Sequence, residues 1–208
     1  MDGTIVDSSA PVLRQWKLWA DRNDIEWDRV LSVMHGRRAI ETMQIVAPHL
    51  PQPETADAFL AVESLDTDGI TEIPGAARFL AQLEAKQWAV VTSAIHDMAR
   101  SRMACAGLPQ VDVLVTADRV KRGKPDPEAF LLAAEELGVD PAECLVLEDS
   151  PFGIEAGRAA GMACLGVLTH YQCADLKADG CIRNYSQLSL QKSDLAGMIE
   201  VVLHDSVQ

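Results

Sequence analysis

The hydrophobic pattern of the chain changes at Pro74-Gly75, a dipeptide typical of a boundary between elements. Beyond it, short apolar runs alternate with segments whose apolar residues recur every three to four positions, which predicts buried strands and amphipathic helices. The expected strands cover 88–92, 111–115, 145–147, 163–168 and a short stretch near Cys181, and the expected helices cover 76–86, 96–106, 127–137, the residues after Ser150-Pro151, and a closing segment from about Asp194. This alternation predicts an α/β fold, a doubly wound parallel sheet with helices on both faces.

The segment before this boundary has a helical pattern. Between residues 12 and 43, Trp16, Trp19 and neighbouring aliphatic residues are spaced as on a helix, and we interpret the tryptophans as packing residues. The break at 35–38, His-Gly-Arg-Arg, suits either a loop that contacts an anion or a solvated turn. Residues 51–74 carry prolines and acidic residues and are interpreted as a solvated acidic connection.

Composition narrows the class of protein. The 208 residues are 48% hydrophobic and 24% charged, ordinary values for a globular protein that buries a core. A net charge of −13 argues against nucleic-acid and anionic-membrane partners, which require basic surfaces. Five scattered cysteines without a CxxC pair favour a reduced, intracellular compartment, and no signal peptide or membrane-length apolar run is evident. We therefore expect a cytoplasmic protein.

Polar side chains stand where the expected strands end. Thr92-Ser93 follows one strand and Glu148-Asp149 another, while Asp2 and Lys124 lie in loops at the same edge. Carboxyl ends of parallel strands meet at one edge of a sheet, where α/β folds place their chemistry. Carboxylates, a hydroxyl and an ammonium group can bind Mg²⁺ and neutralise a transferring phosphoryl group.

Each of these residues also has a purely structural interpretation. Glu148-Asp149 could be an acidic strand-to-helix loop, Thr92 could cap the following helix, and Lys124 could be a surface lysine. The residues alone leave these alternatives open.

Four segments in order resemble the motifs of haloacid dehalogenase-like hydrolases. They are MDGTIVDS at 1–8, VVTS at 90–93, RGKPDP at 122–127 and LEDSP at 147–151. The resemblance covers nearly the whole chain. It is to the helical-cap subfamily that includes β-phosphoglucomutase and small sugar phosphatases, and it is nearest to bacterial sugar-phosphate phosphatases. It implies a Rossmann-like core at 1–7 and 75–208, an inserted α-helical cap at 8–74, Mg²⁺ as cofactor, and an enzyme that works as a monomer.

The same resemblance implies roles for the strand-end residues. Asp2 would be the general acid/base, Thr92 with Ser93 would hold the phosphoryl group, and Lys124 would neutralise its charge. Asp149 and Asp2 would bind Mg²⁺, with Glu148 beside them. Because neighbouring strand residues point to opposite sides, Asp149 is the better ligand candidate.

Residues of the cap loop would help to choose the substrate. His35, Arg37 and Arg38 would face the site, and opening and closing of the cap would exclude water.

The first motif departs from the family pattern. That pattern reads Asp-x-Asp-Gly-Thr, in which the first Asp is the nucleophile that forms an aspartyl-phosphate, and here Met1 occupies the x position. We therefore expect the nucleophile and the first core strand to lie upstream of the printed sequence, and the 208 residues alone to be inactive.

The leading hypothesis is a Mg²⁺-dependent phosphatase of small phosphorylated sugars or polyols. A phosphomutase like β-phosphoglucomutase would need a cap cation for a second phosphate, which Arg37 or Arg38 could supply. A catalytically inactive protein that binds a small phosphorylated metabolite is the third alternative.

Overall fold

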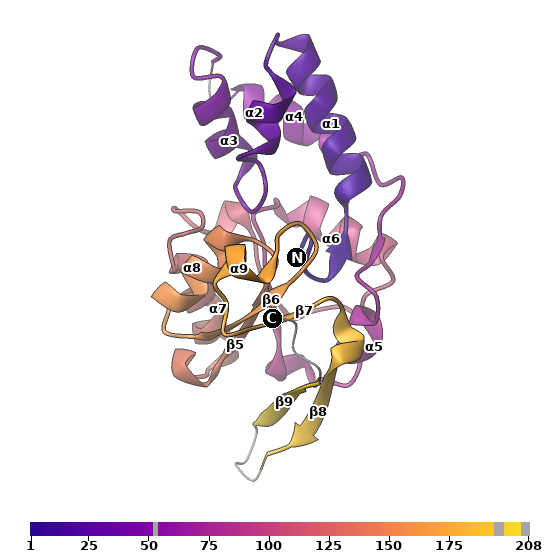
Figure 1. Ribbon diagram of the computed structural model, residues 1–208, viewed down its shortest axis with the longest axis vertical. Helices are drawn as coiled ribbons and strands as arrows, with labels where there is room; N and C mark the ends of the chain where they lie inside the picture. The colour runs from indigo at the N-terminus through magenta and orange to yellow at the C-terminus, as the bar shows by residue number, and fades with distance from the viewer. Residues whose placement is uncertain (52–53, 194–197, 205–208) are drawn as a thin grey trace.

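The computed structural model describes residues 1–51, 54–193 and 198–204, and five short apolar strands form the parallel part of its fold (Figure 1). β3 (Ala89–Val91) pairs with β4 (Val113–Val115), while β5 (Leu145–Glu148), β6 (Ala163–Val167) and β7 (Gly180–Ile182) form a second group. Every pairing within these two groups is parallel. The predicted α/β class is confirmed, with hydrogen bonds dividing the strands into two groups.

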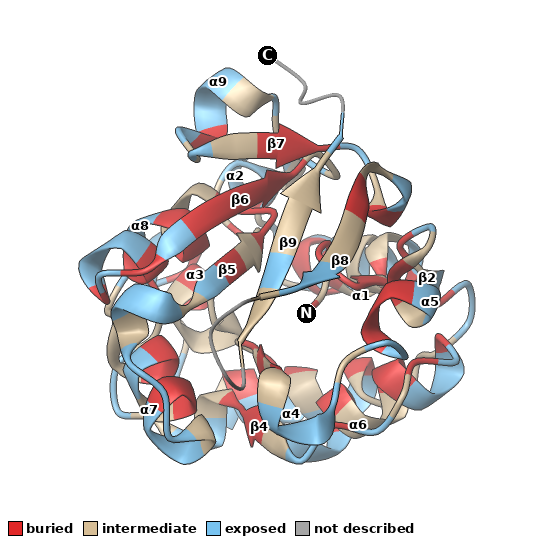
Figure 2. Ribbon diagram, turned by 90° about the horizontal axis from the view of Figure 1, so that it is seen from below, coloured by how far each residue is buried: buried red, intermediate tan, exposed pale blue. Residues whose placement is uncertain are grey.

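Helices flank the strands. In Figure 2, α7 (Glu128–Leu137) and α8 (Pro151–Ala159) lie on one side, and α5 (Ala76–Leu80) and α6 (His96–Cys105) lie on the other. The expected helix at 76–86 is shorter than predicted, because α5 ends at Leu80 and only a 3₁₀ turn follows. The 3₁₀ turns are η1 (Ala85–Gln87), η2 (Ala117–Arg119), η3 (Pro141–Glu143) and η4 (Tyr185–Gln187).

Four helices form a separate layer above the core (Figure 1). They are α1 (Ser9–Arg22), α2 (Trp27–Leu31), α3 (Ala39–Val46) and α4 (Glu54–Glu63), here called the cap helices. Trp16 packs edge-on against Trp19 with ring centroids 5.4 Å apart, as the packing interpretation predicted. The helical cap is thereby present, while the boundaries 8–74 stay a prediction.

Helix α4 was missed by the sequence interpretation, which assigned 51–74 to a connection. Ala56 and Phe59 face the apolar interior of the cap helices, and Phe59 lies 4.4 Å from Trp16 between ring centroids. Their burial stabilises a helix that also carries the acidic residues Glu54, Asp57 and Glu63. The chain leaves and re-enters the core through β1 (Val6–Asp7) and β2 (Thr71–Glu72), which pair antiparallel.

The C-terminal part differs from the prediction. The prediction of a closing helix is wrong for residues 199–203. There β9 (Ile199–Leu203) pairs antiparallel with β8 (Leu188–Lys192) in a hairpin. Residues 194–197 of that prediction lie outside the described residues. A disulfide joins Cys173 in α9 (Cys173–Leu176) to Cys181 in β7, a pairing that the interpretation of the cysteines as reduced did not predict.

An apolar cavity of about 290 Å³ lies between the two strand groups. Residues of β3 and β5 line it, together with Phe130, Tyr185 and the hairpin residues Leu190 and Val201. Among the described residues, β3 pairs only with β4 and β5 only with β6. Each of these two strands therefore has one edge without a ladder partner.

No helix within the described residues is long and apolar enough to cross a membrane.

The acidic connection after α4 is tied to the first cap helix. Arg14 donates to both Asp66 oxygens, at 2.9 and 2.6 Å, and Gln15 donates to Asp66 at 2.6 Å. The Arg14 and Gln15 hydrogen bonds lower the pKa of Asp66 from 3.8 to about 2. The connection is therefore fastened to α1.

We expect the contribution of Arg14 to stability to depend on pH. A carboxylate whose pKa is lower in the folded state contributes stability above 3.8 that is lost as the pH falls towards about 2. The difference in unfolding free energy between the wild type and Arg14→Met, from urea titrations, should shrink over that range. Lys17→Met on the same helix, which breaks the exposed Lys17–Asp21 pair, is the control. A difference unchanged down to about pH 2 would contradict this assignment.

Candidate active site

A cavity of about 120 Å³ lies between the cap helices and the carboxyl ends of the core strands. It brings together most of the residues that the sequence singled out. Some of these residues come from the core and others from the loop between the cap helices. Those that line it are Asp2, His35, Arg37, Thr92, Ser93, Lys124, Glu148 and Asp149. Arg38 does not line it.

Glu148 and Lys124 form a buried ion pair at its base. Glu148 ends β5, and its Oε2 atom accepts hydrogen bonds from the backbone N–H groups of Asp149 and Ser150, both at 3.1 Å, and from the Ser150 hydroxyl at 2.9 Å. Lys124 donates to Oε1. Burial by itself would raise the pKa of Glu148, but Lys124 and the other groups around the carboxylate together bring the pKa below its usual value. Glu148 is therefore a charged carboxylate at a buried position.

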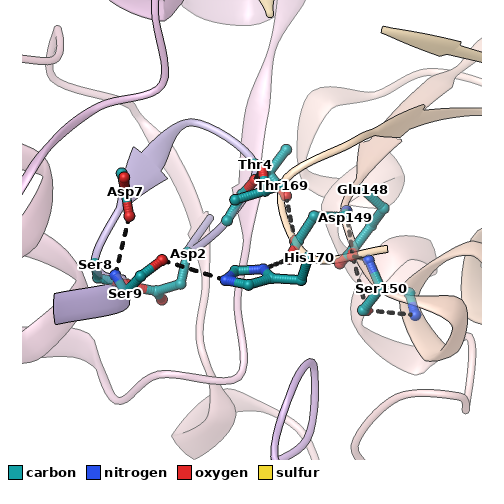
Figure 3. Close-up of polar contacts among 12 residues, drawn as sticks. Asp2, Thr4, Asp7, Ser8, Ser9, Glu148, Asp149, Ser150, Thr169 and His170 are labelled. Carbon is teal, nitrogen blue, oxygen red and sulfur yellow. Dashed lines mark hydrogen bonds and ion pairs between the residues drawn. The ribbon is translucent and has the colours of Figure 1, made fainter. Parts of the chain in front are cut away.

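Asp149 faces the N-terminal loop rather than Lys124. In Figure 3 its carboxylate accepts a hydrogen bond from the Thr4 hydroxyl at 2.9 Å, and His170 Nδ1 lies 3.0 Å from its other oxygen. Gly3 permits this approach, because a Cβ atom there would lie 2.1 Å from Asp149 Oδ2 and the φ angle is +71°. Glu148 and Asp149 thus take different partners.

Asp2 is held by two hydrogen-bond donors, Ser8 and Arg102. Its Oδ1 atom accepts from the Ser8 hydroxyl at 2.6 Å and from Arg102 at 2.9 Å. Burial acts against the charge of Asp2, but Arg102 and the other positive groups prevail and the pKa of Asp2 is lowered. Asp2 is therefore an ionised carboxylate in this arrangement.

The acidic residues fit a magnesium ion in part. Within residues 1–51, 54–193 and 198–204, no three His, Cys, Asp or Glu side chains cluster as a metal-binding group would. Mg²⁺ is usually bound by one or two carboxylates together with substrate phosphate and water, and Asp2 and Asp149 line the same cavity. Glu148 is the weaker candidate, since its oxygens are taken up by Lys124, Ser150 and the backbone.

Thr92 and Ser93 stand at the end of β3. The Thr92 hydroxyl accepts from the backbone N–H of Ala94 at 3.1 Å, so the capping alternative is part of its role. Its hydroxyl proton is free to be donated to another acceptor. Ser93 donates to the carbonyl of Gly36 at 3.2 Å and joins the core to the cap loop.

The cap loop 35–38 packs against the core. His35 stacks on His170 with ring centroids 4.3 Å apart, and burial followed by the nearby His170 charge lowers the pKa of His35. The Arg37 guanidinium lies 4.0 Å from the Phe152 ring centroid. Its Nε atom is buried without a hydrogen-bond partner in the described part of the chain.

Arg38 serves the fold of the cap instead. It pairs with Glu41 in the first turn of α3 and donates to the carbonyl of Lys121 at 3.4 Å. The prediction that Arg38 faces the site is not supported by this placement, since the residue is absent from the cavity lining.

Three ionisable residues of the cavity lining were missed by the sequence interpretation: Glu63, Arg102 and His170. His170 follows a predicted strand, so its place at a strand end was a usable signal. Arg102 lies within α6 and Glu63 at the end of the missed helix α4, and neither position has a local pattern that distinguishes it.

Known proteins are similar to this chain in sequence. Residues 1–161 match the haloacid dehalogenase-like hydrolase family. The chain is 42% identical over 172 residues to hexitol phosphatase A of Escherichia coli (strain K12), covering 80% of each chain. It is 31% identical over 203 residues to glycerol-1-phosphate phosphohydrolase 2 of Saccharomyces cerevisiae, covering 90% of this chain and 81% of the relative.

Solved structures have the same fold. A hydrolase from Pseudomonas syringae superposes with a TM-score of 0.77 at 26% identity, covering 88% of this chain and 90% of that one. A putative β-phosphoglucomutase from Bacteroides vulgatus superposes with a TM-score of 0.75 at 29% identity, covering 88% of this chain and 81% of that one.

Proposed function

Since the chain belongs to the haloacid dehalogenase-like hydrolases, we propose that it is a Mg²⁺-dependent phosphatase of small phosphorylated polyols and sugars. The observation that carries the proposal is the convergence of Asp2, Thr92, Lys124 and Asp149 on one cavity beneath the cap helices. The names of two relatives, a hexitol phosphatase and a glycerol-1-phosphate phosphohydrolase, support this substrate class.

The base of the cavity binds the phosphoryl group in this proposal. The Lys124 ammonium group donates to a phosphoryl oxygen while it remains beside Glu148, and the Thr92 hydroxyl donates to another. Both donors are buried and held before the substrate arrives, so little reorganisation is needed when negative charge develops. They position the phosphorus for attack by an aspartate nucleophile, which forms an aspartyl-phosphate.

Asp2 handles the proton. A protonated Asp2 gives its proton to the oxygen of the departing alcohol in the first step, which leaves it ionised as in this structure. In the second step the ionised carboxylate removes a proton from the water that attacks the aspartyl-phosphate, and this restores the protonated form for the next turnover. Asp149 and Asp2 would hold Mg²⁺, which supplies positive charge to the phosphoryl oxygens when bound. Thr4 and His170 orient Asp149, as second partners commonly do for metal-binding carboxylates.

The cap loop closes the site over the substrate. His35 and Arg37 line the cavity from the cap side, and the Ser93–Gly36 hydrogen bond keeps their loop against the core. The closed loop excludes water from the reacting phosphate.

The family pattern has its nucleophile two positions before Asp2, a position that is not among the 208 residues, so two chains are needed to test the proposal. One is the 208-residue chain, and the other is the same chain preceded by an apolar strand that ends in Asp two positions before Asp2, here called the extended chain. We expect the extended chain to release inorganic phosphate from a panel of polyol and sugar phosphates in Mg²⁺ and to stop with a chelator. The 208-residue chain should bind the same esters without hydrolysing them.

The outcomes separate the candidate functions. The buried Nε atom of Arg37 favours a second candidate function, that of a phosphomutase in which Arg37 binds a second phosphate. Glucose 6-phosphate formed from β-glucose 1-phosphate, without phosphate release, would identify a mutase. Binding without turnover by the extended chain would leave a non-catalytic protein that binds a phosphorylated metabolite.

A further inference from the structure

A second buried ion-pair group lies in the wall of the same cavity. Arg102 on α6 donates through one amino nitrogen to Asp2 at 2.9 Å and through the other to Glu63 at 3.1 Å. Glu63 is the last residue of the cap helix α4, and only 6% of its surface is exposed. Arg102 therefore joins the core, the cap and the proposed general acid/base at one point.

Each of these two carboxylates has one unused oxygen. Asp2 Oδ2 and Glu63 Oε2 accept no hydrogen bond from any residue within 1–51, 54–193 and 198–204. Both oxygens are therefore available to a hydrogen-bond donor that enters the cavity. Burial raises the pKa of Glu63, while the charge of Arg102 and its hydrogen bond act in the opposite direction. In its ionised form the carboxylate can only accept hydrogen bonds.

The neighbours of Glu63 indicate what could satisfy it. In the proposed mechanism Thr92 and Lys124 bind the phosphoryl group and Asp2 contacts the oxygen of the departing alcohol, and all three line the cavity together with Glu63. Because one guanidinium group contacts both carboxylates, Glu63 lies beside Asp2, on the side of the departing alcohol. Trp16 and Leu60 add apolar surface to the lining of the same cavity.

We propose that Glu63, held in place by Arg102, recognises the hydroxyl group on the carbon next to the phosphorylated carbon. The inference rests on the proposed phosphatase function and specifies its substrate class. A hydroxyl donates to the carboxylate, whereas a methylene group or a ring ether oxygen leaves it unsatisfied. Open-chain polyol phosphates are therefore preferred to hexopyranose 6-phosphates, in which the neighbouring oxygen belongs to the ring.

Two esters that differ in this one hydroxyl provide the test. Glycerol 1-phosphate and propane-1,3-diol monophosphate are titrated into the 208-residue chain in Mg²⁺, and the dissociation constants are measured by calorimetry. We expect glycerol 1-phosphate to bind roughly tenfold or more tightly, because the hydrogen bond is to a charged group. In Glu63→Leu the ratio of the two constants should fall to about one.

A conservative variant and a control complete the design. Glu63→Gln keeps an acceptor but loses the charge, so its ratio should be intermediate, and it carries the test if Glu63→Leu does not fold. Glu54→Gln, at the exposed start of the same helix, should keep the wild-type ratio.

The results distinguish this inference from the function on which it rests. Equal binding of the two esters by the wild type, or equal weakening of both by Glu63→Gln, overturns the role of Glu63 and leaves the phosphatase proposal intact. If neither ester binds to the wild type, the proposed function is overturned and this inference with it.

Discussion

Asp149→Ala is expected to lower Mg²⁺-dependent phosphate release by the extended chain by about 10³-fold or more. The change removes the carboxylate that Thr4 and His170 orient, and with it the better of the two candidate ligands for Mg²⁺. Initial rates of phosphate release from a polyol phosphate, measured over a range of Mg²⁺ concentrations, give the size of the loss.

Direct metal binding supplies a second measurement for the same variant. Calorimetric titration of Mg²⁺ into the 208-residue chain should show binding that Asp149→Ala loses. Asp112→Ala, at an exposed position far from the cavity lining, should change neither result. Near-normal turnover by Asp149→Ala would refute the assignment of Asp149 to the metal.

Lys124→Met should reduce both stability and phosphate binding. Glu148 would stay buried without its cationic partner, and breaking a buried ion pair in this way costs about 3–5 kcal/mol of unfolding free energy. The same change removes a proposed donor to the phosphoryl group, so the affinity for inorganic phosphate should also fall. Urea unfolding and phosphate titration measure the two effects separately.

A double variant separates the two roles of Lys124. In Lys124→Met with Glu148→Leu, no unpaired charge is left, so most of the lost stability should return while phosphate binding stays weak. Lys121→Met, an exposed lysine in the same loop, is the matched control. If the double variant recovered phosphate affinity together with stability, Lys124 would have only a structural role.

The sequence predicts the parallel strands and the residues at their ends because both depend on local patterns. Each short apolar run becomes a buried strand such as β3 or β5, and the following polar residues, including Thr92 and Asp149, reach the same edge. This convergence requires only that the strands be parallel. The strand-end residues of the cavity lining were therefore predictable.

Other features depend on contacts distant in the sequence. The pairing of Arg102 with Asp2 spans 100 positions, and His170 reaches Asp149 from the end of another strand. Helix α4 carries only a few buried apolar residues within an acidic, proline-containing segment, so its pattern is weak. The β8–β9 hairpin replaces the expected closing helix because residues 188–192 and 199–203 satisfy each other's backbone groups.

The apolar cavity between β3 and β5 has a consequence for association. Two strands with unpaired edges beside a shared apolar space can accept a further strand, whose backbone pairs with theirs and whose side chains fill the space. In the extended chain the apolar strand before Asp2 is the segment we expect to occupy this space. A separate peptide of that sequence should therefore bind to the 208-residue chain and restore the missing pairing.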